Sequence, residues 1–425
     1  MYRLSLPYIK EKWAHAGFQK YFRNTGWMFI GQMTMIISLF INIWIARHLG
    51  PTNFGSLSYI FAFVGIFAFI GNLGIQDVLI RDLVTYPQDT KKIASTAVWL
   101  LFSGGSIAFV TASIVSLIMN GVTLTTWLIM LYATMFFWSP LSIIGAYFQA
   151  TVQAKQNALI QITGTIIAST LKVYFILTNK GVIWLTLAFT LDYFISGTLY
   201  ILTYKKLKLG FIDLSYFDWN FAKKLLRASW ILMIASAFLY ILSKADQVLV
   251  KNLLDETSLG LYAVAVKLSE VWYFIPGIIC SSLFPAIINA KMAGETIYKN
   301  RLKNLSIFLI FISGSIAAFI SLCAFWLVPF LFGSAYTKSI VVTQIYAWSS
   351  IGYFLIVATM KYLTAENRFQ EIALYSGIAA LTNIILNIYL IPSIGLIGAA
   401  IASVISYAIF PILMFRHKNT PSKLL

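Results

Sequence analysis

The sequence predicts an all-α integral membrane protein, with about twelve transmembrane helices in two six-helix lobes around a central cavity. Sixty per cent of the 425 residues are hydrophobic and only 11% are charged, against about 25% charged in a typical soluble domain. The hydrophobic residues also form runs of about 20 residues, the length that a helix needs to cross about 30 Å of hydrocarbon. A soluble core cannot absorb so much apolar surface, so the expected environment is a bilayer.

Polar residues divide the hydrophobic runs into twelve expected spans. These are residues 27–47, 56–79, 93–119, 123–147, 158–178, 182–203, 229–250, 259–285, 305–327, 339–361, 372–391 and 394–415. The first run is too long for a signal-peptide core and lacks a small-residue cleavage site, so we interpret it as a retained span. Residues 1–25 before it are expected to be cytoplasmic and to include a short helix lying on the membrane surface.

The connectors predict the domain organisation and the orientation. The longest connector, 204–228, is basic and separates an N-terminal lobe (1–203) from a C-terminal lobe (229–425). Lys and Arg near span ends stay cytoplasmic, and 24 of them fall on the side of this connector and both termini, against 4 on the other side. Both termini are therefore expected in the cytoplasm. This topology also explains the net charge of +17, so we expect membrane lipid and not nucleic acid as a partner.

Similar residues recur in the two lobes at a nearly constant separation. Offsets of 203, 204 and 205 residues relate Trp27 to Trp230, Arg47 to Lys251 and Gly55 to Gly260. Later in the lobes, offsets of 213 and 214 relate Lys155 to Arg368 and Gly181 to Gly395. This spacing indicates two lobes of the same orientation, related by an axis along the membrane normal, with the central cavity between them.

Charged residues in or at the ends of the spans are the candidate site residues. A charge at the middle of a span costs roughly 2.5–3.5 kcal/mol on the insertion scale, so each one has to face protein, a partner or water. The basic candidates are Arg47, Arg81, Lys172, Lys244 and Lys267. The acidic candidates are Asp77, Asp192, Asp246 and Glu270.

Spacing predicts partners for some of these charges. Lys267 and Glu270 are three residues apart on one helix and can pair directly. Lys172 and Asp192 lie at depths that differ by roughly 6 Å, within reach of a lysine side chain. Lys244 and Asp246 are two residues apart and point in different directions, so at least one needs another partner.

Because Lys244 or Asp246 needs a partner elsewhere, we expect the span 229–250 to contribute to the functional site. Arg47 and Arg81 are at span ends, where snorkelling to water is a sufficient explanation.

The sequence shows no signature of an enzyme, a metal site or a cofactor site. His15, His48 and His417 are isolated, and no glycine-rich phosphate loop precedes a helix. Cys280 and Cys323 lie in or at the ends of apolar runs, where a thiol behaves as a small hydrophobic group. The loops on the less basic side have only about 4–12 residues, which leaves no room for an external catalytic domain.

Residues 46–59, Ala-Arg-His-Leu-Gly-Pro-Thr-Asn-Phe-Gly-Ser-Leu-Ser-Tyr, resemble the polysaccharide-transport branch of the multidrug/oligosaccharidyl-lipid/polysaccharide exporter superfamily. That branch typically shows an alanine-arginine, leucine-glycine-proline, phenylalanine-glycine run after its first span. Weaker agreement comes from residues 72–75, from Asp246 followed by residues 260–262, and from residues 391–400 near the end of the chain. The resemblance runs over most of the sequence.

The resemblance implies an alternating-access flippase in a bacterial inner membrane. Such a protein moves undecaprenyl-pyrophosphate-linked oligosaccharide units from the cytoplasmic to the periplasmic leaflet, for O-antigen or capsule-like polysaccharide, with a polysaccharide polymerase complex as a further partner. On that view Arg47, Arg81, Lys172, Lys244 and Lys267 contact the substrate head group. Asp77, Asp192, Asp246 and Glu270 are then charge partners or ion-coupling groups.

Two other functions remain open at this point. A cation-coupled multidrug antiporter of the same superfamily would use its buried acids to bind a cation, and the candidates here include about as many acids as bases. The Arg-His-Leu-Gly-Pro run favours the flippase. A membrane polymerase or ligase is expected to carry a large periplasmic loop with catalytic residues, and the short loops disfavour it.

Overall fold

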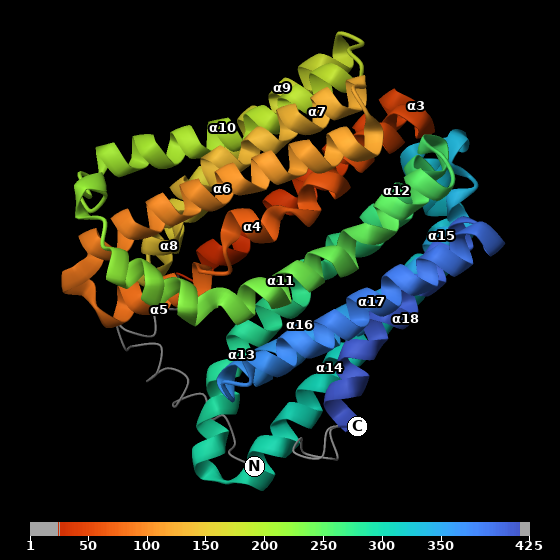
Figure 1. The fold of residues 1–425 in the computed structure, drawn as a ribbon. Helices are drawn as coiled ribbons and strands as arrows, with labels where there is room; N and C mark the ends of the chain where they lie inside the picture. The colour runs from red at the N-terminus through yellow and green to blue at the C-terminus, as the bar shows by residue number, and fades with distance from the viewer. Residues whose placement is uncertain (1–23, 25, 417–425) are drawn as a thin grey trace.

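The structure, a computed structural model, describes residues 24 and 26–416, and every regular element in that part of the chain is helical (Figure 1). The surface helix expected within residues 1–25 falls almost entirely outside the described residues. The N-terminal half contains α3 (Thr34–Ile66), α4 (Ala68–Asn72), α5 (Gln76–Thr85), η1 (Pro87–Asp89), α6 (Thr90–Asn120), α7 (Leu124–Ala133), η2 (Thr134–Leu141), α8 (Ser142–Ala150), α9 (Ala154–Leu177) and α10 (Val182–Lys206).

The C-terminal half follows a connector that holds the short 3₁₀ helix η3 (Leu214–Tyr216). Its elements are α11 (Trp219–Leu253), α12 (Glu256–Glu270), η4 (Val271–Tyr273), α13 (Phe274–Ala293), α14 (Glu295–Phe332), η5 (Ser334–Tyr336), α15 (Ser339–Tyr346), α16 (Ser349–Ala365), α17 (Phe369–Ile394) and α18 (Leu396–Arg416). Helices α11 and α14 begin well before the expected spans 229–250 and 305–327. Each helix starts in the charged segment that precedes its apolar run.

Within the described residues, eleven helical stretches are long and apolar enough to cross a membrane. The first of them, Gly26–Ile66, contains the first expected span and the beginning of the second. Its backbone breaks at Gly50, which has φ 67° and ψ 174°. Pro51 then starts a new helical segment, a position where its missing N–H is not needed. With this break counted, the stretches agree with about twelve spans, and the predicted all-α membrane fold is confirmed.

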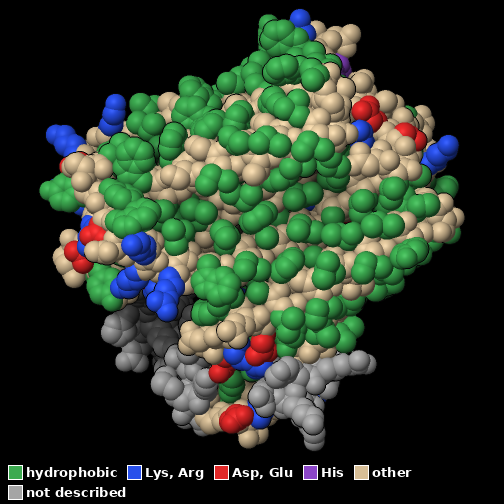
Figure 2. Space-filling model, in the orientation of Figure 1, with side chains coloured by type: hydrophobic (Ala, Val, Ile, Leu, Met, Phe, Trp, Pro, Cys, Tyr) green, Lys and Arg blue, Asp and Glu red, His purple; other side chains and the backbone are tan. Residues whose placement is uncertain are grey.

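The surface of the molecule is suited to lipid. Large apolar side chains on the outer helices are strongly exposed, among them Leu322 (83%), Phe325 (75%) and Ile118 (77%). Figure 2 shows hydrophobic side chains over the middle of the visible face, with Lys, Arg, Asp and Glu gathered toward the two ends of the helices. An apolar surface of this extent is found where hydrocarbon covers it.

The connector is fixed to the first turns of α6. The Asp218 carboxylate accepts a hydrogen bond from the Phe221 N–H (2.7 Å) and so caps the first turn of α11. It also pairs with Lys92 at 2.6 Å. The hydrogen bonds from Lys92 and from the Phe221 N–H hold the pKa of the Asp218 carboxyl below its usual value.

The two halves meet where α3 crosses α12, at the end of the molecule remote from the connector (Figure 1). A Cβ atom on Gly55 would lie 1.7 Å from the Glu256 carbonyl oxygen, and one on Gly260 would lie 1.8 Å from that of Pro51. Only glycine permits so close an approach of two backbones. Thr52 and Thr257 share a hydrogen bond of 2.8 Å beside the crossing. Gly55 and Gly260 are 205 residues apart in the sequence, and so are Thr52 and Thr257. This is one of the offsets found between the two lobes in the sequence.

Two further hydrogen bonds reinforce this end. The Ser56 hydroxyl donates to the Glu256 carboxylate (2.7 Å), and the Tyr336 hydroxyl donates to the Ala46 carbonyl (2.7 Å). The structure is therefore closed at the end of the halves that carries the α3–α12 crossing.

Candidate functional site

Lys244 and Glu270 face each other in the C-terminal half. Helix α11 carries Lys244, α12 ends at Glu270, and the Lys244 Nζ lies 3.8 Å from a Glu270 carboxylate oxygen. The Tyr346 hydroxyl donates to the other oxygen at 3.0 Å. The pair borders a cavity of about 380 Å³, which is also lined by Tyr240, Tyr273, Tyr353 and Tyr407. The cavity thus combines an ion pair with aromatic hydroxyl groups.

Lys267 is not the partner of Glu270, contrary to the prediction from their spacing. Glu270 is the last residue of α12, and its carboxylate is turned toward α11 and α15 instead of along its own helix. Lys267 is half-buried and forms no ion pair or hydrogen bond with any residue that the structure describes. It lies within electrostatic reach of Lys244, Glu270 and Lys172. Lys267 is therefore a cation beside other cations, without a partner of its own among the described residues.

Asp246 lies on another side of α11 and has separate partners. Its carboxylate is 1% exposed and accepts hydrogen bonds from the Tyr262 hydroxyl (2.6 Å) and the Ser403 hydroxyl (3.1 Å). The Gln247 N–H also donates to it, at 2.7 Å. The prediction that Lys244 and Asp246 point to different partners is confirmed. Three donors satisfy this carboxylate without a direct ion pair.

Lys172 and Asp192 form the ion pair predicted for the N-terminal half. The Lys172 Nζ on α9 lies 2.9 Å from a carboxylate oxygen of Asp192 on α10. The same ammonium group lies 4.0 Å from the centre of the Phe189 ring, a cation–π contact. Lys172 is buried, with only 7% of its side chain exposed, whereas 33% of the Asp192 side chain is exposed.

Loss of the Lys172 ammonium is expected to destabilise the protein. Lys172→Met leaves Asp192 without its cation, and we expect a loss of about 1–3 kcal/mol in the free energy of unfolding, because removing one partner strands the other charge. The double variant Lys172→Met with Asp192→Asn should recover most of that loss. Thermal unfolding of the detergent-purified proteins measures both effects. Equal stability of wild type and Lys172→Met would contradict a structural role of the pair.

The candidates at span ends lie apart from the buried charges. Arg81 is 63% exposed and donates from Nε (3.0 Å) and Nη2 (2.9 Å) to the buried carboxylate of its neighbour Asp82. Asp77, in the first turn of α5, and Arg47, at the other end of the molecule, are both exposed. In the part of the chain that the structure describes, none of the three forms an ion pair or hydrogen bond with Lys172, Lys244, Lys267 or the acids near them.

Two groups of residues around these sites were not predicted. The first group is the tyrosines that line the cavity beside Lys244, and the second is a set of amide side chains in the N-terminal half, described below. The chain contains 23 tyrosines, and spacing within a helix does not separate those that face a cavity from those that face lipid.

The chain matches the model of the family described as polysaccharide biosynthesis protein over residues 44–341. It is 26% identical over 199 residues to the "Probable low-salt glycan biosynthesis flippase Agl15" of Haloferax volcanii. That match covers 45% of this chain and 41% of the relative, so the chain spans less than half of the relative's length.

Solved structures of transporters share the fold. One, described as the inward-facing conformation of a multidrug resistance MATE family transporter of the MOP superfamily, has a TM-score of 0.66 at 16% identity, over 90% of this chain and 92% of that one. The lipid II flippase MurJ, in an inward closed conformation, has a TM-score of 0.65 at 16% identity, over 92% of this chain and 86% of that one.

At these identities the two structures establish the fold alone. The family model, in contrast, covers well over half of the chain and matches it by sequence. The chain belongs to the family described as polysaccharide biosynthesis protein, which agrees with the resemblance to the polysaccharide-transport branch that residues 46–59 indicate.

Proposed function

We propose that this membrane protein is a flippase for undecaprenyl-pyrophosphate-linked oligosaccharide units, which it moves from the cytoplasmic to the periplasmic leaflet of a bacterial inner membrane. The family supports a role in polysaccharide biosynthesis, and the relative named above is described as a glycan biosynthesis flippase. The observation that carries the proposal is the group of three buried or half-buried lysines, Lys172, Lys244 and Lys267, of which Lys267 has no anionic partner among the described residues.

A pyrophosphate supplies the additional negative charge that is needed to balance these three lysines. Asp192 and Glu270 pair with Lys172 and Lys244, and Lys267 remains unpaired within the described part of the chain. In a low-dielectric surrounding an unpaired cation is costly, and a bound anion offsets that cost. In this proposal the lysines hold the pyrophosphate as point charges. Asp192 and Glu270 are exchangeable partners, and Asp246 is a charge partner or ion-coupling group.

In this proposal the direction of transport follows from the expected orientation of the protein in the membrane. If the basic connector and both termini lie in the cytoplasm, the closed end at the α3–α12 crossing faces the periplasm. The substrate then enters from the cytoplasmic side, and the crossing has to open to release it. Arg81 and Arg47 stand at the two ends of this path, where we assign them contacts with the head group on entry and on exit, with Asp77 as a charge partner near the entrance.

A cation-coupled multidrug antiporter is the second candidate, because the multidrug transporter and the lipid II flippase fit the fold almost equally well. The buried Asp246, which has no lysine partner among the described residues, is the feature that favours it. Deletion of the gene separates the two. The flippase predicts accumulation of lipid-linked oligosaccharide and loss of surface polysaccharide. Normal polysaccharide together with increased sensitivity to cationic dyes would instead identify a drug exporter.

A further inference from the structure

Amide side chains gather around a second cavity, in the N-terminal half. This cavity of about 360 Å³ lies between the first helical stretch and helices α5, α8, α9 and α10. The amide residues in its lining are Asn24, Gln32, Gln76, Gln149, Asn157 and Gln161. Among the described residues, its lining contains no Asp, Glu, Lys or Arg. The cavity is therefore polar but uncharged.

Only some of these amides have a structural role. The Asn24 side-chain oxygen accepts from the Ala154 N–H (2.7 Å) at the start of α9. Asn157 donates to the Gly145 carbonyl (3.1 Å) and accepts from the Tyr200 hydroxyl (3.2 Å). These two residues join the walls of the cavity: Asn24 holds the start of α9, and Asn157 links α9 to α8 and α10.

The four glutamines have no such partner. The side-chain amides of Gln32, Gln76, Gln149 and Gln161 make no hydrogen bond with the residues that the structure describes. Gln76, Gln149 and Gln161 are exposed and Gln32 is half-buried, so their amides are accessible from the cavity. Each amide offers two donors and two acceptor lone pairs. Four unpaired amides that line one cavity are thus available to a ligand that both donates and accepts hydrogen bonds.

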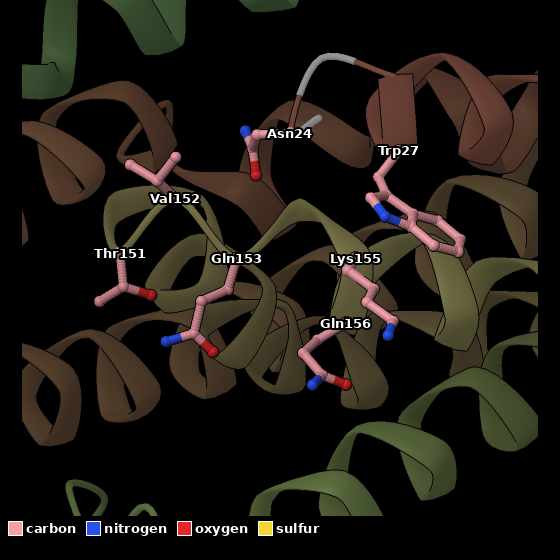
Figure 3. Close-up of a pocket in the computed structure, with 7 residues that line it drawn as sticks. All are labelled: Asn24, Trp27, Thr151, Val152, Gln153, Lys155 and Gln156. Carbon is pink, nitrogen blue, oxygen red and sulfur yellow. The ribbon is translucent and has the colours of Figure 1, made fainter. Parts of the chain in front are cut away.

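A neighbouring cavity of about 550 Å³ shares Asn24 and Trp27 with this one. Figure 3 shows its lining, in which Gln153, Lys155 and Gln156 come from the turn before α9 and its first residues. The Lys155 ammonium lies 5.7 Å from the centre of the Trp27 ring. The two cavities together offer amide groups and an aromatic ring, and no acidic residue is found among the described residues that line them. Their volumes are in the range of small-molecule sites, about 300–1,000 Å³.

We propose that the cavity lined by the four glutamines binds uncharged, hydroxyl- and acetamido-bearing sugar residues of the substrate. Sugar hydroxyl groups and acetamido groups both donate and accept hydrogen bonds, as the glutamine amides do, whereas the described lining of this cavity offers a pyrophosphate no cation. Gln161 and Lys172 lie on the same helix, about 16 Å apart along its axis. One extended head group can therefore place its sugars against the glutamines while its pyrophosphate contacts the lysines. This inference rests on the proposed function and divides recognition of the substrate between two sites.

Binding measurements on the full-length protein in lipid nanodiscs test whether substrate recognition is divided between the glutamines and the lysines. The probes are the lipid-linked oligosaccharide extracted from gene-deleted cells and undecaprenyl pyrophosphate without sugar. The double variant Gln149→Leu with Gln161→Leu keeps the side-chain size and removes two amides. We expect its affinity for the glycan-bearing lipid to fall about tenfold, as for two neutral hydrogen bonds. Its affinity for the sugar-free lipid should change less than twofold, which also reports that the variant is folded.

The matched control is Gln370→Leu, which changes an exposed amide at the start of α17 outside both cavities. It should bind both lipids as the wild type does. An unchanged affinity of the double variant for the glycan-bearing lipid, or an equal loss for both lipids, would overturn the glutamine site. Equal binding of the two lipids by the wild type would do the same and leave the flippase proposal intact. A wild type that binds neither lipid would overturn the flippase proposal itself.

Discussion

A disulfide between cysteines at positions 52 and 257 is expected to stop transport, and its reduction is expected to restore it. In the structure the hydroxyl oxygens of Thr52 and Thr257 are 2.8 Å apart, one on each half of the protein. Thr52→Cys with Thr257→Cys should therefore oxidise readily, because the side chains already point at one another. In an alternating-access cycle this end has to open, and a covalent bond across it prevents that motion.

The cross-linking experiment measures surface polysaccharide and the cross-linked fraction in the same cells, before and after oxidant and then after reductant. Each single cysteine variant should transport normally under all three conditions. A matched control is Thr123→Cys with Thr126→Cys, whose hydroxyl oxygens are 3.2 Å apart within the N-terminal half. A bond there leaves the two halves free to move. Undiminished transport by a fully cross-linked 52–257 pair would exclude opening at the α3–α12 crossing.

Lys244→Ala is expected to lower the rate of polysaccharide export about ten- to a hundredfold, while the protein still inserts and accumulates. Lys244 lies beside the tyrosine-lined cavity with its ammonium group 3.8 Å from Glu270. A contact between a cation and a phosphate contributes about 1.5–3 kcal/mol, which corresponds to that range of rates if the contact is used in transport. The measurement is surface polysaccharide per unit of inserted protein.

Two variants make the Lys244 result specific. Lys338→Ala removes an exposed lysine just before α15, outside the cavity beside Lys244, and should leave export unchanged. Lys244→Arg keeps the positive charge and should retain more activity than the alanine variant. If Lys244→Ala exported polysaccharide normally at a normal protein level, Lys244 would not belong to the substrate site.

The fold could be predicted because a bilayer imposes simple rules on a sequence. The number of apolar runs that are long enough to cross the bilayer gives the number of spans. The break at Gly50–Pro51 is visible in the sequence as a glycine followed by a proline. Span ends were less well predicted, because α11 and α14 continue past the apolar runs from which the spans were inferred. The closeness of the α3–α12 crossing could not be inferred, although Gly55 and Gly260 had been recognised as equivalent positions.

The charged site was predicted only where depth in the membrane decides the contact. Lys172 and Asp192 lie on neighbouring helices at depths that a lysine side chain can bridge, and they pair as expected. The predicted partner of Glu270, Lys267, was wrong. Spacing on α12 contains no information about the two residues that do contact Glu270, Lys244 on α11 and Tyr346 on α15. Neutral glutamines attract no notice in a sequence search for buried charges. Their grouping depends on how four helical segments pack, and only the three-dimensional structure shows it.

The leaflet in which the lipid-linked oligosaccharide resides gives the most direct test of flipping. In spheroplasts whose polymerisation step is blocked, a membrane-impermeant reagent that oxidises and labels sugar diols modifies only the molecules on the outer face. With the wild-type protein, we predict that most of the lipid-linked oligosaccharide is labelled. Without the protein, or with Lys244→Ala, the total pool should rise and the labelled fraction should fall to a small residue. A labelled fraction that is the same with and without the protein would show that it does not move these lipids across the membrane.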